Sequence, residues 1–311
     1  MKRIIIDTDM GSDDYIAVQL AMLSKKIKVE GISLVHGNTT IFNVKRNIFK
    51  TLDMIDKLDE VKIYEGMSTN IKNFGKEDND NAHGSNGFSD VVYETVEGKI
   101  ESTNAIDWMI DLVKNSPKKI SIVAIGPLTN IASAILKDSE FAKNIKSLII
   151  MGGAENFGNI TPYAEFNFYK DPYAASVVFN SKIKDIVMIG FNITKEVTIN
   201  TELEKMLLDS NDSKAKFIYD ISRASAELDR NKNKVDGAII NDAINICYLL
   251  DKTVLKLKKV KVEIELDDME RLGESKVYYN KDYNCNLAVG VNRQKCIKKI
   301  FKTLLPNVYK K

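Results

Sequence analysis

The hydrophobic pattern near the start of the chain predicts a strand followed by a helix. An apolar run over Arg3–Ile6 stops at Asp7, as expected for a short buried strand. From Ser12 onward apolar residues recur at helical spacing, and Ser12 is a suitable N-cap for that helix. A second strand over Val29–Val35 and a second helix over Val44–Ile55 repeat this order. Such alternation predicts a largely parallel sheet with helices on both faces.

The same alternation continues along the chain. Further buried strands are predicted at Ile120–Ile125, Ser147–Met151 and Ile186–Gly190. Ser210–Lys234 is charged and mostly helical in pattern, and beyond Lys256 the apolar spacing approaches the strand period, which predicts a hairpin or edge strands. No repeat or linker interrupts the pattern. We therefore expect a single domain over residues 1–311, an α/β fold with one open, mostly parallel twisted sheet flanked by helices.

The composition is that of a soluble globular protein, with 44% apolar and 28% charged residues. The 45 basic and 43 acidic residues give a formal net charge of +2, so there is no electrostatic basis for binding nucleic acid or a membrane surface. The first apolar run is too short for a signal peptide, and no stretch is long enough to span a membrane. Cys247, Cys285 and Cys296 have no CxxC spacing and are expected to be reduced, buried thiols of a cytoplasmic protein.

An acidic turn follows the first predicted strand. Residues 7–14, Asp-Thr-Asp-Met-Gly-Ser-Asp-Asp, place four carboxylates where ligands of open α/β sheets bind. Two like charges ~4 Å apart repel by about 4 kcal/mol at an effective dielectric of about 20, and a bound cation removes that cost. Because the side-chain donors are all oxygens, a hard cation is favoured over zinc. Helix capping explains Ser12 and Asp13 but does not explain Asp7 and Asp9.

Two other kinds of site share part of this pattern. An EF-hand loop also contains DxDxxG, but it needs a preceding helix and a late Glu ligand, and both are absent here. A strand followed by Asp-x-Asp also opens the haloacid-dehalogenase phosphatases, in which Thr or Val usually stands two residues after the second Asp. That position is Gly11 here. A phosphatase is therefore the weaker interpretation.

Five ordered motifs resemble those of the inosine–uridine-preferring nucleoside hydrolase family. They are the acidic turn at 7–14, Val-His-Gly-Asn-Thr at 35–39, Gly-Pro-Leu-Thr-Asn at 126–130, Met-Gly-Gly at 151–153 followed by Gly-Asn-Ile-Thr-Pro-Tyr-Ala-Glu-Phe-Asn at 158–167 and Asp-Pro at 171–172, and a late acidic motif with Asp-Gly at 236–237 and Asp242. The long match at 151–172 is the most specific. Within it Glu165 and Asn167 alternate around Phe166, so both can face the same side of an extended segment. The motifs cover residues 7–242, and the C-terminal strands fit more loosely.

The resemblance implies a calcium site and a ribose site. The metal ligands it implies are Asp9, Asp14, Asp242 and the backbone carbonyl of Ile125. The ribose hydroxyls are expected to contact Asp13, Asn38, Glu165 and Asn167, while Met151 and Asn159 line the sugar pocket and Phe166 packs near the ring. Calcium accepts six to eight oxygen ligands, which such a set with a water and two ribose hydroxyls supplies, whereas magnesium fits less well.

The reaction that the resemblance implies is direct attack of water on the anomeric carbon, giving ribose and free base in nucleoside salvage. Asp9, beside the metal and its bound water, is the expected general base. Nearby carboxylates stabilise the oxocarbenium-like transition state. The hydroxyl contacts imply poor activity on deoxynucleosides, since a missing hydroxyl leaves buried polar groups unpaired. The resemblance also implies a homodimer or homotetramer.

The chain departs from the family pattern beside the leaving base. Many members have His before the late Asp, where it protonates the base. Here that residue is Asn241, which can donate a hydrogen bond but cannot deliver a proton. His83 lies in a polar loop, Gly75–Gly87, that we expect to be mobile and near the site, and it is the candidate base contact or acid. His36 is expected to be structural.

Aromatic residues do not settle the base preference. Purine-specific members of the family sandwich the base between tryptophans, but Trp108 lies in a helical pattern far from the motifs and is expected to pack in the core. Tyr163, Phe166 and Tyr219 are the aromatic candidates for stacking.

Three functions remain open on the sequence alone. The first is a calcium-dependent ribonucleoside hydrolase. The second is a hydrolase of another N-ribosyl compound, such as nicotinamide riboside, whose leaving group needs no proton, and Asn241 motivates it. The third is a ribose- or nucleoside-binding relative without turnover, against which Asp9 argues because a binder needs no general base.

Overall fold

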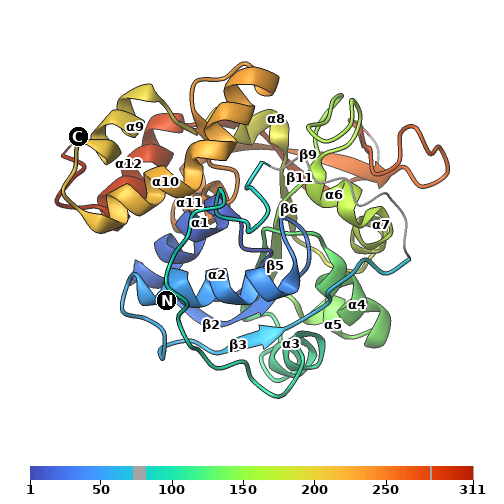
Figure 1. The fold of residues 1–311 in the computed structure, drawn as a ribbon. Coiled ribbons are helices and arrows are strands. Elements are labelled where there is room, and N and C mark those ends of the chain that lie inside the picture. Colours follow the sequence, from blue (N-terminus) through green and yellow to red (C-terminus); the bar gives the residue numbers. More distant parts are fainter. Residues whose placement is uncertain (73–81, 281, 311) are drawn as a thin grey trace.

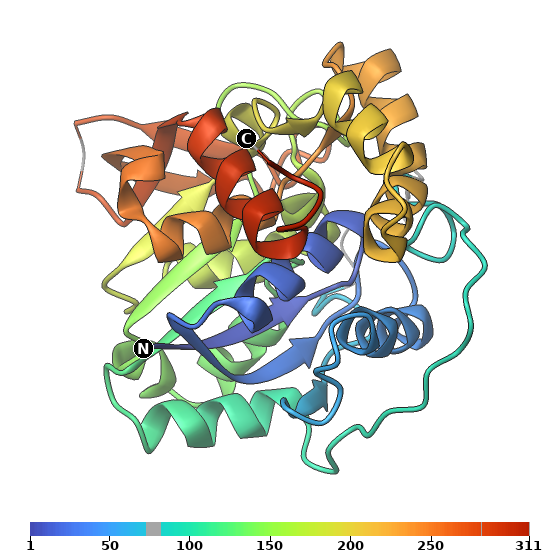
Figure 2. The same ribbon diagram turned by 90° about the vertical axis from the view of Figure 1, so that its left-hand side faces the viewer.

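A sheet of nine strands forms the centre of the molecule. The computed structural model describes residues 1–72, 82–280 and 282–310. Within them the strand order is β10-β9-β11-β6-β5-β4-β1-β2-β3 (Figures 1 and 2). The strands of this sheet are β1 Lys2–Thr8, β2 Ile27–Leu34, β3 Ile63–Glu65, β4 Ile120–Ala124, β5 Ser147–Met151, β6 Ile186–Ile189, β9 Leu255–Ile264, β10 Ser275–Tyr278 and β11 Cys285–Val291. The order places β1 in the middle of the parallel part.

Helices cover both faces of the sheet (Figure 2). They are α1 Ser12–Leu23, α2 Ile41–Asp53, α3 Ala105–Lys114, α4 Thr129–Lys137, α5 Phe141–Asn144, α6 Phe166–Lys170, α7 Pro172–Phe179, α8 Phe191–Thr194, α9 Thr201–Leu208, α10 Ser213–Leu228, α11 Ala243–Leu250 and α12 Arg293–Leu304, with a π-helical turn η1 Asp229–Asn233 and a 3-10 turn η2 Lys252–Val254. A two-stranded ribbon, β7 Thr198–Ile199 and β8 Ala238–Ile239, lies outside the main sheet.

The predicted open, mostly parallel sheet is confirmed. Each pair from β3 through β6 is parallel, and β11 is parallel to β6. The predicted hairpin or edge strands beyond Lys256 are also present, since β9 pairs antiparallel with both β10 and β11. Parallel strands buried on both faces are apolar throughout, as in the predicted strands.

The alternation of side chains along β1 explains the two-faced core. Ile4 and Ile6 pack in one cluster with α1, α11 and α12, while Ile5 packs in the other with α3, α4 and α7. All three are fully buried. Since successive strand residues point to opposite faces, one short apolar run anchors both helix layers.

The chain changes direction around β1, and this change positions the site. β1 pairs with β2 on one side and with β4 on the other, so the connections after β1 and after β4 lead away in opposite directions. In such sheets a crevice forms beyond the carboxyl ends of the two strands. The acidic turn follows β1 at this point.

Two local predictions are wrong. Ser12 is the first residue of α1 rather than its N-cap, because Gly11 occupies that position and the Asp14 carboxylate accepts from the Gly11 amide. Glu165 and Asn167 do not alternate along an extended segment, because Phe166–Lys170 is helical and Glu165 caps it. In both places a side-chain hydrogen bond to backbone amides decides the conformation.

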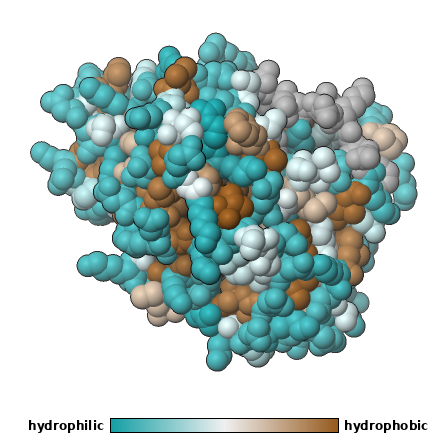
Figure 3. Space-filling model, turned by 60° about the horizontal axis from the view of Figure 1, so that its bottom comes forward, coloured by the Kyte–Doolittle hydropathy of each residue, from teal (hydrophilic) through white to brown (hydrophobic). Residues whose placement is uncertain are grey.

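The face of the molecule shown in Figure 3 is mostly hydrophilic. On this face, apolar patches are interrupted by hydrophilic side chains.

Cys247, Cys285 and Cys296 are buried free thiols, as predicted. Among the described residues, none of the helices is both long enough and apolar enough to cross a bilayer. Residues 75–81 of the predicted loop Gly75–Gly87 lie outside the described part of the chain.

The Trp108 ring is part of the packing between α3 and the sheet edge. It stacks on Tyr64 of β3, with ring centroids 4.0 Å apart and an interplanar angle of 10°. A Cβ added at Gly31 would lie 2.5 Å from the Trp108 ring, so β2 also approaches it closely. The expected core role of Trp108 is therefore supported.

Replacing Trp108 should destabilise the fold through the loss of this packing. We expect Trp108→Ala to lower the free energy of unfolding by about 2–3 kcal/mol, and Trp108→Phe to lower it by less, because the second variant keeps a stacked ring. Urea titrations followed by circular dichroism measure both. An unchanged stability of Trp108→Ala would contradict this role.

Candidate active site

The acidic turn begins with a strained residue. Met10 follows Asp9 and adopts a left-handed conformation with φ of 45°. Its carbonyl accepts a hydrogen bond from the Asn47 side chain at 2.9 Å, which helps to hold the turn. Left-handed non-glycine residues persist only where the surroundings fix them, and they cluster at functional sites. The left-handed residue therefore marks the end of β1 next to Asp9 as a candidate functional turn.

Asp9 is fully buried and only partly hydrogen-bonded. Its Oδ2 accepts from the Asn38 amide at 2.8 Å, while Oδ1 has no hydrogen-bond partner in the described structure. Backbone packs tightly against both oxygens. A Cβ at Gly37 would lie 1.9 Å from Oδ2, and one at Gly126 would lie 3.0 Å from Oδ1. Burial, and next the charge of Asp14, raise the pKa of Asp9 well above its usual value.

Three more carboxylates gather beside Asp9. Oxygens of Asp13, Asp14 and Asp242 lie within 4.8 Å of one another, and all three residues are buried. Burial, and next the charge of Asp13, raise the pKa of Asp14 to about 7 and that of Asp242 well above its usual value. Asp9 lies outside this closest set but shares its electrostatic field. Among the ion pairs of the described residues, none joins Asp13, Asp14 or Asp242 to a Lys or Arg side chain, and the imidazole of His83 lies 3.7 Å from Asp13.

Asp7 supports the turn from behind. Its Oδ1 accepts from Asn130 Nδ2 at 2.8 Å and from the Ser33 hydroxyl, which join β1 to β2 and α4. Burial raises the pKa of Asp7 to about 7. The sequence predicted no contact for Asp7. In the structure its hydrogen bonds to Asn130 and Ser33 hold β1 against its neighbours.

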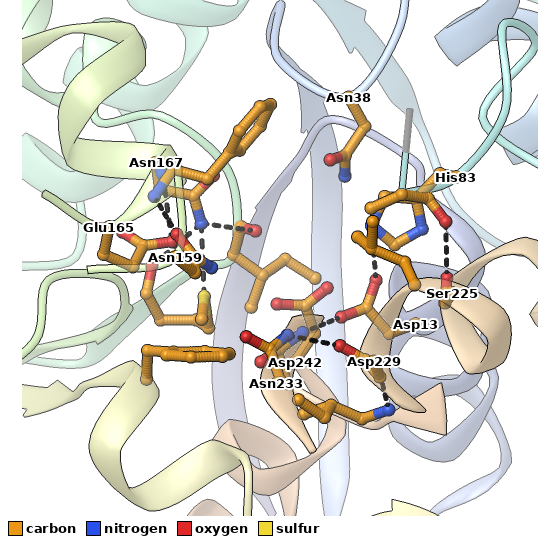
Figure 4. A pocket seen from close by; sticks show the side chains of 18 of the residues that line it. Asp13, Asn38, His83, Asn159, Glu165, Asn167, Ser225, Asp229, Asn233 and Asp242 are labelled. Carbon is orange, nitrogen blue, oxygen red and sulfur yellow. Dashed lines mark hydrogen bonds and ion pairs between the residues drawn. The ribbon is translucent and has the colours of Figure 1, made fainter. Parts of the chain in front are cut away.

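A pocket opens above the carboxylates and encloses about 630 Å³, including its mouth. Most of the predicted site residues line it: Asp13, Asn38, His83, Ile125, Met151, Asn159, Glu165, Phe166, Asn167, Asn241 and Asp242. The remaining two, Asp9 and Asp14, lie beneath its floor and are fully buried. Figure 4 shows Asp13, Asn38, His83, Asn159, Glu165, Asn167 and Asp242 around this pocket. Asp9 and Asp14 belong to the same region because their charges act on Asp242.

One wall of the pocket consists of residues from the long motif. Glu165 accepts from the amides of Gly153, Asn167 and Phe168, which fixes its carboxylate. Asn167 Nδ2 donates to the carbonyls of Met151 and Ile125, at 3.1 and 3.3 Å. These bonds hold carboxylate and amide oxygens toward the cavity, opposite Asp13 and Asp242 (Figure 4). The wall offers hydrogen-bond partners for a polyhydroxylated ligand.

The opposite wall carries His83 and Asn241. Asn241 Nδ2 donates to Asp13 Oδ2 at 2.9 Å, and its Oδ1 accepts from the Thr194 hydroxyl at 2.7 Å. Because a carboxylate can only accept, Asp13 fixes the orientation of the Asn241 amide. His83 Nε2 lies 3.7 Å from Asp13 Oδ1.

His36 lies outside the pocket in a separate hydrogen-bond chain. Its Nε2 is 2.9 Å from the Thr129 hydroxyl, which donates to Asp171. Burial, and next Lys170, lower the pKa of His36 to about 4. This arrangement supports the expected structural role.

Several pocket residues were not found from the sequence. They are Ala82, Phe191, Ser225, Leu228, Asp229, Lys232, Asn233 and Ile239. Most come from the end of α10, from η1 and from β8, which approach the site only through tertiary packing.

Of the aromatic candidates for stacking, Tyr219 is wrong, since it lines a different depression with Arg223 and Arg230. The ring of Tyr163 is in contact with the Arg271 guanidinium, whose Cζ lies 4.4 Å from the ring centroid. Phe166 and Phe191 are the aromatic residues of the pocket lining.

The donor set suits a hard divalent cation. Every charged ligand near the cluster is a carboxylate, the Ile125 carbonyl lies in the pocket lining, and the Oδ1 atoms of Asp9 and Asp13 are buried without hydrogen-bond partners. Buried unpaired carboxylate oxygens are costly unless a cation or proton satisfies them. The residues present therefore fit an oxygen-coordinated metal ion.

Comparisons with known proteins agree with the geometry. Residues 4–298 match the family described as inosine-uridine preferring nucleoside hydrolase. A probable uridine nucleosidase 2 of Oryza sativa subsp. japonica is 34% identical over 267 residues, covering 85% of this chain and 78% of that protein. The pyrimidine-specific ribonucleoside hydrolase RihB of Escherichia coli (strain K12) is 32% identical over 267 residues, covering 86% and 84%.

Solved structures give the same picture. A plant nucleoside hydrolase superposes with a TM-score of 0.89 at 28% identity, covering 97% of this chain and 98% of the other. A purine-preferring ribonucleoside hydrolase from Gardnerella vaginalis gives a TM-score of 0.89 at 26% identity with the same coverage. These relatives include both pyrimidine-specific and purine-preferring proteins.

Gly37 provides a test of the Asp9 position. A Cβ at Gly37 would overlap the Asp9 carboxylate, whereas one at Gly290 meets nothing closer than 3.6 Å. We expect Gly37→Ala to weaken divalent-cation binding at least about tenfold by displacing a ligand, and Gly290→Ala to leave it unchanged. Calorimetric titration with calcium measures both. Equal affinity in Gly37→Ala and wild type would contradict the placement of Asp9.

The buried acids predict the pH dependence of the metal-free protein. The pKa values of Asp7 and Asp14 are raised to about 7, so their protonated forms stabilise the fold below about pH 4 and this contribution is lost as the pH rises through 7. In excess chelator, the melting temperature should therefore fall between about pH 5 and about pH 8. Asp7→Asn should reduce this fall.

The control for that measurement is Asp111→Asn, since Asp111 is exposed on α3. It should keep the wild-type pH dependence. A melting temperature that is constant or rises over the same interval would show that the buried carboxyls are charged in the metal-free fold.

Proposed function

The chain belongs to the inosine–uridine-preferring nucleoside hydrolase family, whose members are glycosidases, and we propose that it hydrolyses the N-glycosidic bond of ribonucleosides with calcium as its metal. The observation that carries the proposal is the cluster of buried carboxylates on the floor of a pocket whose walls are lined with fixed amide and carboxylate groups. That combination supports binding of a cation, a sugar and a water molecule close to one another.

Asp9, Asp14, Asp242 and the carbonyl of Ile125 are the proposed metal ligands. Asp13 lies close enough to contribute to the same field. Calcium is favoured over magnesium because it accepts more oxygens in a less regular geometry. When bound, calcium would supply positive charge beside the sugar and would attract oxygen ligands such as water and hydroxyl groups. The pKa values of these acids are raised first by burial and next by their mutual repulsion, and a bound cation would offset the repulsion.

Asp9 is the proposed general base. Its Oδ1 has no hydrogen-bond partner in the described structure, so it can accept the proton of a water that attacks the anomeric carbon. As the water oxygen bonds to that carbon, the carbon–nitrogen bond breaks and its electron pair leaves with the base. The products are free ribose and free base.

The sugar contacts follow from the walls. Asp13, Asn38, Glu165 and Asn167 are the proposed partners of the ribose hydroxyls, with Met151, Asn159 and Phe166 around the ring. The side chains of Asp13, Glu165 and Asn167 are buried and held by other residues, so they are already oriented before substrate binds. Fixed negative groups around the sugar stabilise the positive charge that develops on it in the transition state.

His83 and Asn241 are the proposed partners of the departing base. His83 lies across the pocket from Glu165 and Asn167 (Figure 4), and Asn241 donates to Asp13 beside His83. This activity suits nucleoside salvage, in which ribonucleosides supply reusable bases.

A second candidate is hydrolysis of an N-ribosyl compound whose base leaves without a proton, such as nicotinamide riboside. The observation that favours it is the engagement of Asn241 at both ends, by Asp13 and Thr194. An amide in that position cannot deliver a proton to the base. The same metal and sugar contacts would serve both substrates.

The test is ribose release by the calcium-loaded enzyme from uridine, inosine, 2′-deoxyuridine and nicotinamide riboside, measured as reducing sugar. Uridine or inosine should be hydrolysed, and 2′-deoxyuridine should be slower by about 10⁴-fold, because buried partners of the missing hydroxyl stay unpaired. Asp9→Asn should lower kcat about a thousandfold without unfolding the protein.

Asp111→Asn is the matched control and should retain full activity, since Asp111 is exposed and outside the site. Turnover of nicotinamide riboside alone would select the second candidate. Release of ribose from none of the compounds would refute both.

A further inference from the structure

His83 is held by the first residue of α1. The Ser12 amide lies 3.2 Å from His83 Nδ1, and the Ser12 hydroxyl lies 2.8 Å from the same atom. Ser12 is buried, and the His83 side chain is only 13% exposed. Two groups of one residue therefore converge on one ring nitrogen.

These contacts fix the tautomer of the imidazole. A backbone amide can only donate, so Nδ1 must accept and cannot carry a proton while this bond exists. The ring proton is then on Nε2. The Ser12 amide is one of the amides at the start of α1 that have no partner within the helix, so it is free to donate to Nδ1.

Ser225 completes the arrangement. Its hydroxyl donates to the Ala82 carbonyl at 2.8 Å and lies 3.3 Å from the Ser12 hydroxyl. Since the Ser225 proton is used on Ala82, the Ser12 proton is available for Nδ1, to which Ser12 is closer. The residue before His83 is thus tied to α10, and His83 itself is tied to α1.

The other ring nitrogen faces the site. Nε2 makes no hydrogen bond to a described residue, and its neighbour Asp13 Oδ1, at 3.7 Å, is also without a hydrogen-bond partner. Asp13 Oδ2 is already occupied by Asn241. The geometry leaves one directed N–H donor on the wall assigned to the base.

We propose that His83 assists departure of the base as a neutral imidazole that donates a hydrogen bond from Nε2, and that Ser12 is the positioning residue that holds it in this form. This rests on the proposed function. When the carbon–nitrogen bond breaks, the base takes the electron pair and an acceptor atom of the base receives the Nε2–H hydrogen bond. Asp9 receives the proton of the attacking water, and the base obtains its own proton from solvent after it leaves. The substrate class is therefore a nucleoside whose base carries a hydrogen-bond acceptor.

The tautomer can be observed directly because the chain contains only two histidines. In calcium-loaded protein labelled with ¹⁵N-histidine, His83 should show an unprotonated Nδ1 and a protonated Nε2, with His83→Gln assigning the signals. A proton on Nδ1, or on both nitrogens, at the pH of the assay would overturn the proposal whatever the activity.

Ser12→Ala separates positioning from folding. It should lower kcat for uridine or inosine about tenfold, the effect of losing one hydrogen bond, with little change in KM. It should leave hydrolysis of 4-nitrophenyl β-D-ribofuranoside within about twofold of wild type, because that leaving group is stable without a donor. Ser12→Thr, which keeps the hydroxyl, should restore the rate on the natural substrate.

Ser24→Ala, at the other end of the same helix, is the control and should match wild type on both substrates. An equal loss on both substrates in Ser12→Ala, or no loss on either, would overturn the positioning role. If wild type hydrolyses no ribonucleoside, the proposed function fails, while the nitrogen spectrum still decides the state of His83.

Discussion

The repulsion among buried carboxylates at the end of β1 is the constraint on which the rest of the site depends. Asp9, Asp13, Asp14 and Asp242 share one desolvated region, and burial raises the pKa of three of them, Asp9, Asp14 and Asp242. Charges placed so close in a medium of low dielectric repel strongly, and only a proton or a cation relieves them. The same groups are therefore a source of instability without metal and a preformed set of ligands with it.

The fold holds these groups in place by packing backbone against them. β1 ends between β2 and β4, where the crevice of the sheet opens, and the left-handed Met10 turns the chain there. Gly37 leaves no room for a side chain beside Asp9. The Glu165 carboxylate and the Asn167 amide are tied to backbone on the far wall. Rigid surroundings of this kind keep a site oriented without reorganisation during the reaction.

The wall around the base differs in character, since it uses neutral donors. Asn241 is held by Asp13 and Thr194, and His83 is held by Ser12. Neither arrangement requires a charged acid. In the proposed reaction this division is favourable, because positive charge would develop on a sugar beside the carboxylates while electrons would accumulate on a base beside the N–H donors.

The sequence by itself determined the alternating strands and helices, the parallel sheet and many of the residues that line the pocket, because apolar periodicity and short motifs are local properties. Local pattern failed at Ser12 and at Phe166–Lys170, where competing hydrogen bonds from Asp14 and Glu165 set the helix starts. It also failed to find Ser225, Asp229 and the partners of His83. Those contacts join residues far apart in the chain, and only the packing of α10 and η1 over the crevice decides them.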